Sequence, residues 1–400
     1  MSTQSNKLHG GNVYAAIRSR GGGFGDFLDF SANINPLGLS PQVRSALLET
    51  MDAVMAYPDP DAVALKEAIA LQYRVPVECI ETGNGAVELM YLLCRILTPE
   101  RVLTPSPTFS EYESAARAAG LPIVKMMLRE SAGFVPDLDE LAQNLCPADL
   151  LFFCNPNNPT GVVFTRQQLL PLIERASEIG AHVVVDESFN DFRPNAEVES
   201  CRTLVAEYPG VVVLQSLTKF LAVPGLRLGF MLGRRALIEQ MKTLRDPWNV
   251  NVMAQAAGVA GLAEQEYRRK TVELITQEKE RMRCTLQSIP GIRVFPPSVN
   301  FILVNIGDSG WDAPRLQEAL LQHRILIRNC ANFDGLSDRF IRLAIKGPAE
   351  NQHLLDVLKK IMLGVDSECQ QYFSYDMDKL FGIKRSDTRD TVISNFQRKG

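Results

Sequence analysis

The segment Ser216-Leu-Thr-Lys219 follows the apolar run 211–214 and precedes Pro224-Gly-Leu-Arg-Leu-Gly229. The run is short and β-branched, which is typical of a buried strand, so it places Lys219 just beyond a strand end. Partial burial there would lower the pKa of the amine and leave it free to form an imine. Arg227 would supply a fixed cation for a phosphate nearby. A lone S-x-x-K pattern usually belongs to a surface lysine, so the interpretation depends on the neighbouring strands.

Apolar runs of the same kind occur at 101–104, 150–154 and 183–186. Stretches with helical spacing lie between or before them, as at 61–74 and 88–97. Runs of this kind suit a parallel sheet that is buried on both faces. The alternation of strands and helices therefore predicts an α/β fold with a large doubly wound domain.

Polar residues follow two of these strands. Asn155-Pro-Asn-Asn-Pro-Thr-Gly161 comes after 150–154, and Asp186-Glu-Ser-Phe189 ends 183–186. Taken singly, the first is an ordinary turn and Asp186 is a helix cap. Together with Lys219, however, Asn158 and Asp186 lie at the carboxyl ends of strands, where open α/β sheets bind ligands. These three residue types fit pyridoxal phosphate (PLP). An aspartate can pair with its pyridine nitrogen, an asparagine can hydrogen-bond its phenolic oxygen, and a lysine amine can form an imine with it.

The pattern of predicted strands and helices changes after residue 265. A charged helix at 266–286 leads to short strands at 292–295, 301–304, 325–328 and 340–344, with helices at 313–323 and 350–363. We therefore predict four parts. They are an N-terminal segment (1–45) that joins the small domain, a large PLP-binding domain (46–265), a small α+β domain (266–364) and a C-terminal extension (365–400).

Composition limits the class of protein. The formal net charge of −4 gives no reason to expect nucleic acid or an anionic membrane as partner. The N-terminus lacks the apolar segment of a secretory signal, and no apolar run approaches membrane-spanning length. The eight cysteines and four histidines do not cluster, so no metal site is expected and reduced thiols in a cytoplasmic protein fit best.

With these motifs the chain resembles the fold-type-I PLP enzymes, which are aminotransferase class I/II-like, over nearly all of 1–364. The resemblance implies that Lys219 carries the cofactor as a Schiff base. It also implies a homodimer with shared active sites, in which Tyr57 reaches the cofactor phosphate of the partner subunit. Phe109 would stack on the cofactor ring. The phosphate would be bound by Gly85 and Ala86 in the turn Gly83-Asn-Gly-Ala86, and by Ser216 and Arg227.

Longer motifs resemble the threonine-phosphate decarboxylases of cobalamin biosynthesis. They are His9-Gly-Gly-Asn12, Asp29-Phe-Ser-Ala-Asn-Ile-Asn-Pro-Leu-Gly38, Ile325-Leu-Ile-Arg-Asn-Cys-Ala-Asn-Phe-Asp-Gly-Leu336 and Arg339-Phe-Ile-Arg-Leu-Ala-Ile345. The resemblance implies decarboxylation of L-threonine O-3-phosphate to (R)-1-amino-2-propanol phosphate, with L-serine O-phosphate open as a second substrate. The implied substrate-binding residues are His9, Asn33, Asn158, Arg328 and Arg342. Guanidinium groups suit the carboxylate and the phosphate of such a substrate, whereas a structural salt bridge is the alternative role for each arginine.

Two other functions share some of these features. Histidinol-phosphate aminotransferases share the fold and the PLP residues, but they usually carry tyrosine where Phe189 stands, and the motifs at His9 and Asn329 argue against them. A non-catalytic PLP-binding sensor would need a DNA-binding domain, and the segment before His9 is too short to form one.

Overall fold

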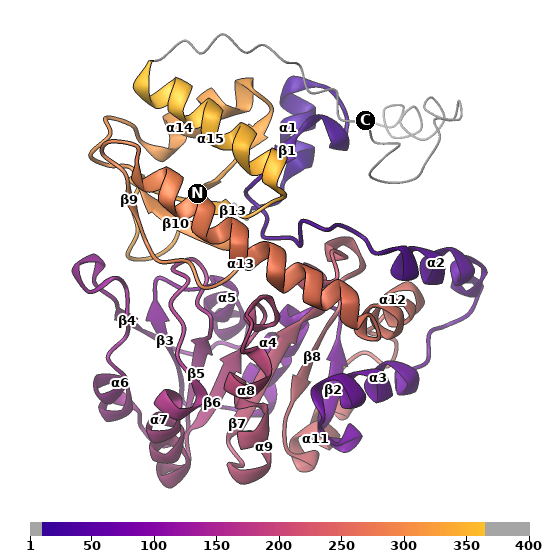
Figure 1. Cartoon of the computed structure of the whole chain (residues 1–400). Coiled ribbons are helices and arrows are strands. Elements are labelled where there is room, and N and C mark those ends of the chain that lie inside the picture. The colour runs from indigo at the N-terminus through magenta and orange to yellow at the C-terminus, as the bar shows by residue number, and fades with distance from the viewer. Residues whose placement is uncertain (1–9, 365–400) are drawn as a thin grey trace, which may run out of the picture.

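A seven-stranded sheet forms the lower half of the computed structural model (Figure 1), which describes residues 10–364. Its strands run in the order β2-β8-β7-β6-β5-β3-β4. Their bounds are β2 (Ile80–Gly83), β3 (Arg101–Ser106), β4 (Ile123–Met127), β5 (Asp149–Cys154), β6 (His182–Asp186), β7 (Val211–Ser216) and β8 (Gly229–Leu232). The strands predicted at 101–104, 150–154, 183–186 and 211–214 are all present.

Helices cover both faces of this sheet. Side chains alternate along each central strand, so Leu150 and Phe152 pack into one apolar cluster, whereas Leu151 and Phe153 pack into the other. One face carries α4 (Ala86–Ile96), α5 (Glu111–Ala118) and α11 (Arg235–Leu244). The other carries α3 (Val63–Tyr73), α6 (Leu138–Asn144), α7 (Arg166–Ile179) and α12 (Val252–Leu262). Burial on both faces explains why these strands read as continuous apolar runs.

The sheet is mixed rather than purely parallel. β8 pairs antiparallel with both β7 and β2, while the remaining pairs are parallel. The connection from β7 to β8 runs through α10 (Leu217–Phe220). The fold is nevertheless the expected fold-type-I α/β fold, with a large sheet and a smaller one.

The smaller sheet is antiparallel and has the order β12-β13-β10-β9. Its strands are β9 (Arg293–Val294), β10 (Phe301–Asn305), β12 (Arg328–Asn329) and β13 (Phe340–Ala344). The strand predicted at 325–328 is wrong as one element. Residues Ile325–Leu326 form β11, which pairs in parallel with β1 (Leu28–Asp29), and the strand is interrupted at Ile327 before β12 joins the other sheet.

The long helix α13 (Gln265–Gln287) crosses the molecule between the two sheets (Figure 1). Helices α14 (Ala313–Gln322), α15 (Pro348–Leu363) and α1 (Val13–Arg20) lie at the top of Figure 1, above the smaller sheet, and α2 (Pro41–Glu49) packs on α12. Two further short helices are α8 (Ala196–Glu199) and α9 (Leu204–Glu207). Among the described residues no helix is long and apolar enough to cross a membrane. The division into domains stays a prediction, and the extension 365–400 lies outside the described residues.

Candidate active site

Lys219 lies on α10, directly after the buried strand β7. Its amine donates a hydrogen bond to the Ser216 hydroxyl (Nζ···Oγ 2.8 Å) and lies 5.5 Å from the centroid of the Phe189 ring. Burial lowers the pKa of Lys219 to about 8; Asp186 opposes this shift, and the cations Arg227 and Arg342 add to it. A lysine with a lowered pKa is deprotonated more readily near neutral pH than an exposed lysine, and imine formation requires the neutral amine.

Asp186 ends β6, the strand next to β7, and is 2% exposed. Its carboxylate accepts one hydrogen bond at each oxygen. The backbone N–H of Ser188 donates to Oδ1 at 2.9 Å, and the hydroxyl of Tyr112 donates to Oδ2 at 2.7 Å. Since each oxygen keeps a second lone pair, the carboxylate can still pair with a further donor.

Asn158 connects the large sheet to the small one. Its side-chain Oδ1 accepts a hydrogen bond from Nη1 of Arg342, which stands on β13. The amide of Asn158 is therefore oriented with its oxygen toward the arginine, which leaves the Nδ2 group as a donor for a ligand.

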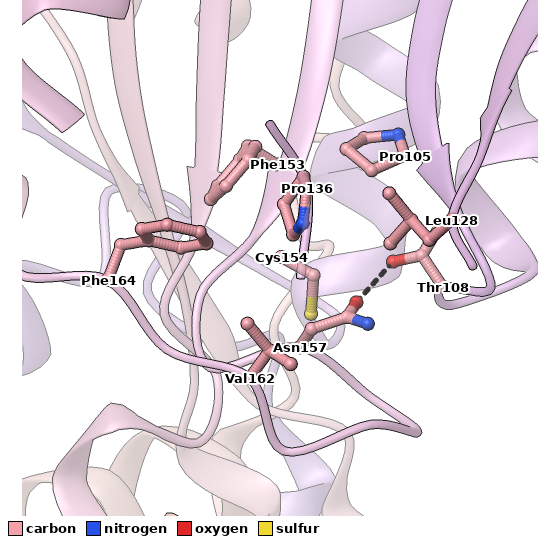
Figure 2. Close-up of a pocket in the computed structure, with 9 residues that line it drawn as sticks. All are labelled: Pro105, Thr108, Leu128, Pro136, Phe153, Cys154, Asn157, Val162 and Phe164. Atoms are coloured by element: carbon pink, nitrogen blue, oxygen red, sulfur yellow. Dashed lines mark hydrogen bonds between the residues drawn. The ribbon is translucent and has the colours of Figure 1, made fainter. Parts of the chain in front are cut away.

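A small cavity lies behind the loop that carries Asn158 (Figure 2). At about 10 Å³ it has room for no more than a single water molecule, so it is a packing gap rather than a substrate site. In its wall the Thr108 hydroxyl donates to Oδ1 of Asn157 at 2.7 Å, and Nδ2 of Asn157 donates to the Pro107 carbonyl at 2.9 Å. These bonds tie the loop before Phe109 to the loop of Asn158.

A cradle for an anion forms where α4 begins. Gly85 has φ +79° and precedes Ala86, the first residue of the helix, whose N-terminal N–H groups can bind a phosphate. The guanidinium of Arg227 lies over this turn, because a Cβ on Gly85 would be 2.5 Å from its Nη2 atom. Gly229 packs closely against the backbone of the same turn, since a Cβ on Gly229 would be 2.4 Å from the Ala86 nitrogen. With Ser216 beside Lys219, the residues expected to bind a phosphate come together.

Arg328 and Arg342 are buried and have no carboxylate partner within residues 10–364. Arg342 donates to the Ser31 carbonyl at 2.9 Å, and its Nε has no hydrogen-bond partner among the described residues. Arg328 donates to the Asn329 carbonyl at 2.9 Å and to Oδ1 of Asn332 at 2.7 Å. Burial lowers the pKa of both arginines, that of Arg342 to about 10. Salt bridges therefore do not explain these arginines.

The remaining predicted residues lie as follows. Asn33 is buried, and its Oδ1 has no partner among the described residues. Phe109 packs edge-on against Tyr112, with ring centroids 5.6 Å apart. Tyr57 is 78% exposed and stacks on Trp248. His9 lies outside the described residues, but Gly10 packs against the Ser31 carbonyl, and a Cβ there would be 3.5 Å from Cδ of Arg328.

The sequence profile of the aminotransferase class I and II family matches residues 25–358. The chain belongs to this family. A threonine-phosphate decarboxylase from Salmonella typhimurium is 36% identical over 90% of this chain and 98% of the relative. A histidinol-phosphate aminotransferase from Symbiobacterium thermophilum is 34% identical over 84% of this chain and 91% of the relative. The crystal structure of the histidinol-phosphate aminotransferase from Clostridium acetobutylicum superposes with a TM-score of 0.78 at 30% identity, covering 84% of this chain and all of that one.

Enzymes of this family use PLP, and this chain is a PLP-dependent enzyme of the class. The residues fit the cofactor. A desolvated amine, a buried carboxylate with free lone pairs and a glycine cradle under an arginine lie at the carboxyl edge of one sheet. No cluster of three or more metal-ligating side chains occurs in the described part of the chain.

Sequence reasoning missed three residues that support this site. Tyr112 binds Asp186, and Thr108 and Asn157 tie two site loops together. Thr108 and Tyr112 lie within three residues of Phe109, and Asn157 precedes Asn158, so their place in the sequence was visible. Their partners were not, since they depend on the packing of separate loops.

Proposed function

We propose that the chain decarboxylates L-threonine O-3-phosphate to (R)-1-amino-2-propanol phosphate, the linker of the cobalamin nucleotide loop. The observation that carries the proposal is the pair of buried arginines, Arg328 and Arg342, without carboxylate partners in the described structure. The proposed substrate has two anionic ends, and guanidinium groups match both. The Salmonella relative named for this activity, aligned over nearly its whole length, supports the same substrate.

Bound PLP supplies an electron sink for the pair of electrons released at the substrate α carbon. Lys219 would hold the cofactor and, once displaced, return a proton to the α carbon. Asp186 would pair with the pyridine nitrogen, and Asn158 would donate to the phenolic oxygen. Gly85, Ala86, Ser216 and Arg227 would bind the cofactor phosphate, and Phe109 would cover the ring.

The arginines would decide which bond breaks. Amino transfer requires the Cα–H bond perpendicular to the cofactor ring, whereas decarboxylation requires the Cα–carboxylate bond there. Two fixed cations on the small sheet can hold the substrate anions so that only the second arrangement is reached. Asn33, and His9 beyond Gly10, would complete the substrate side. Phosphoserine lacks one methyl group, worth only about 1–3 kcal/mol of discrimination, so it is proposed as a poorer second substrate.

The test is to incubate the purified enzyme with phosphothreonine in heavy water, without 2-oxoglutarate. We expect carbon dioxide and an amine product with one non-exchangeable deuterium at the former α carbon, while the cofactor ends as PLP. Histidinol phosphate with 2-oxoglutarate is the comparison. Rapid amino transfer from it, with no carbon dioxide from phosphothreonine or phosphoserine, would favour the histidinol-phosphate aminotransferase function and refute the decarboxylase.

We also propose that the enzyme is a homodimer with shared active sites. Large apolar side chains are exposed on and beside α2, α3 and α12, namely Leu48, Met51, Val54, Met55, Tyr57, Val63, Trp248 and Val259. A groove of about 360 Å³ lies among the same three helices. Monomeric proteins seldom expose so many clustered apolar side chains, which favours a protein partner on this face. In a second copy, Tyr57 would reach the cofactor phosphate across the interface.

A further inference from the structure

Tyr112 is a fully buried tyrosine that contacts the proposed cofactor partner Asp186. Its side chain is 0% exposed, and its hydroxyl donates to Oδ2 of Asp186 at 2.7 Å. The ring is held on two sides. It stacks on Phe152 with centroids 4.9 Å apart and planes within 7°, and it meets the edge of Phe109 at 5.6 Å. The hydroxyl therefore has a fixed position relative to the sheet.

The hydrogen bond sets the orientation of the carboxylate. The Ser188 N–H alone would leave Asp186 free to turn about its χ2 torsion, which is broad for aspartate. A second donor, from α5, defines the plane of the carboxylate. Burial and the nearby Asp186 charge raise the pKa of Tyr112 well above its usual value, so its hydroxyl remains a donor over the whole working range.

We propose that Tyr112 is a positioning residue that holds Asp186 in the orientation in which it pairs with the pyridine nitrogen of PLP. Through its contact with Phe109, the same side chain couples that orientation to the ring proposed to stack on the cofactor. The inference rests on the proposed role of Asp186, and the experiment distinguishes the failure of one from the failure of the other.

The test compares Tyr112→Phe with Tyr73→Phe in the full-length holoenzyme. Tyr73 is a matched control, because it is also buried and donates to a buried carboxylate, Asp191, at 2.6 Å. Asp191 keeps its ion pair with Arg268 and is not one of the residues proposed to bind the cofactor. Both variants keep the aromatic ring and lose one hydroxyl, so a purely structural effect should be similar in the two.

The readouts are the rate of PLP release to a trapping reagent and the visible circular dichroism of the bound cofactor. A hydrogen bond to a charged acceptor corresponds to roughly a ten- to hundredfold effect, so we expect PLP release to accelerate by that factor in Tyr112→Phe. The dichroism should change in the same variant. Tyr73→Phe should leave both unchanged, although its thermal stability falls.

Asp186→Asn provides the third arm. If this variant releases PLP at the wild-type rate, the proposed role of Asp186 is wrong and the role of Tyr112 falls with it. If Asp186→Asn releases PLP rapidly while Tyr112→Phe behaves like Tyr73→Phe, then Asp186 keeps its role and the positioning by Tyr112 is refuted.

Discussion

Arg328 and Arg342 are direct register partners on the antiparallel strands β12 and β13. Like charges placed opposite each other on neighbouring strands destabilise a sheet. Burial adds to the cost, as the lowered pKa of both arginines reflects. Within residues 10–364 neither arginine forms an ion pair, and the charge of Asp29 offsets the burial of Arg342 only in part. The two arginines destabilise the free protein. A dianionic substrate bound between the two guanidinium groups would explain why such a pair is present.

The first prediction follows from that cost. Arg328→Met replaces one cation by an apolar chain of similar length, so the substrate-free holoenzyme should unfold at a temperature about 1–3 °C higher. The same variant should lose most of its affinity for phosphothreonine. Differential scanning calorimetry and substrate titration measure the two effects.

Arg324→Met is the control for this prediction. Arg324 is an arginine close by in the chain, but its side chain is half exposed and pairs with Asp26 at the surface. We expect neither the gain in stability nor the loss of substrate affinity in that variant. An Arg328→Met holoenzyme that unfolded below the wild type would contradict the electrostatic interpretation.

The second prediction concerns the pH at which Lys219 captures PLP. Its pKa is lowered from 10.5 to about 8, so below that pH the neutral amine falls about tenfold per pH unit. When PLP is mixed with cofactor-free protein, the rate of imine formation followed by absorbance should rise with pH and level off above about 8. Borohydride should then fix the cofactor to Lys219. Lys219→Ala should show no such pH-dependent phase, and a plateau reached only near the usual lysine pKa would rule out a desolvated amine.

The sequence was sufficient to predict the residues at the carboxyl edge of the large sheet. Lys219, Asp186 and Asn158 each follow an apolar strand, and buried strands leave a local pattern that needs no knowledge of the rest of the fold. The strand Phe340–Ala344 was likewise predicted with its observed bounds. These features depend on near neighbours in the chain.

Features that depend on distant segments were missed. The pattern of 325–328 is continuous, yet the chain divides it between β1 and β13, which come from opposite ends of the described structure. The antiparallel β8 was missed because its pairing depends on β2 and β7, not on its own residues. The Tyr112–Asp186 bond joins residues 74 positions apart, and nothing in either motif indicates the other.

The third prediction concerns the proposed dimer. Met55 is 92% exposed and is one of the apolar side chains proposed to form the interface, so Met55→Glu places a charge where an interface core would exclude one. Sedimentation should show a dimer for the wild type and a weakened dimer for this variant. Val198→Glu, at a 72% exposed apolar position on α8, should stay dimeric.

Subunit mixing tests whether the active sites are shared. If Tyr57 acts across the interface, mixing Tyr57→Phe subunits with Lys219→Ala subunits should create some sites that lack both defects. Activity should therefore exceed that of either variant alone. A fully active wild-type monomer, or a mixture with no such gain, would refute the shared sites.

The fourth prediction concerns Glu187. It follows Asp186 in the chain, but its hydrogen-bond partners are different residues. Its carboxylate is 2% exposed and accepts hydrogen bonds from the Ser200 hydroxyl at 2.6 Å and the Cys201 N–H at 2.7 Å. Burial raises the pKa of Glu187 from 4.5 to about 7, although these donors favour the ionised form. Between these two pH values the folded state therefore binds more protons than the unfolded state.

The sign of the pH effect follows from that difference. Stability falls as pH rises wherever the folded state holds the extra proton, so the free energy of unfolding should drop between about pH 4.5 and pH 7 by up to about 3 kcal/mol. Other groups titrate in this range, so the measurement is the difference between the wild type and Glu187→Gln in urea unfolding. Glu67→Gln removes an exposed carboxylate and should leave the slope unchanged. If the wild type and Glu187→Gln show the same slope, Glu187 ionises in the folded protein as readily as in water, and its hydrogen bonds offset its burial.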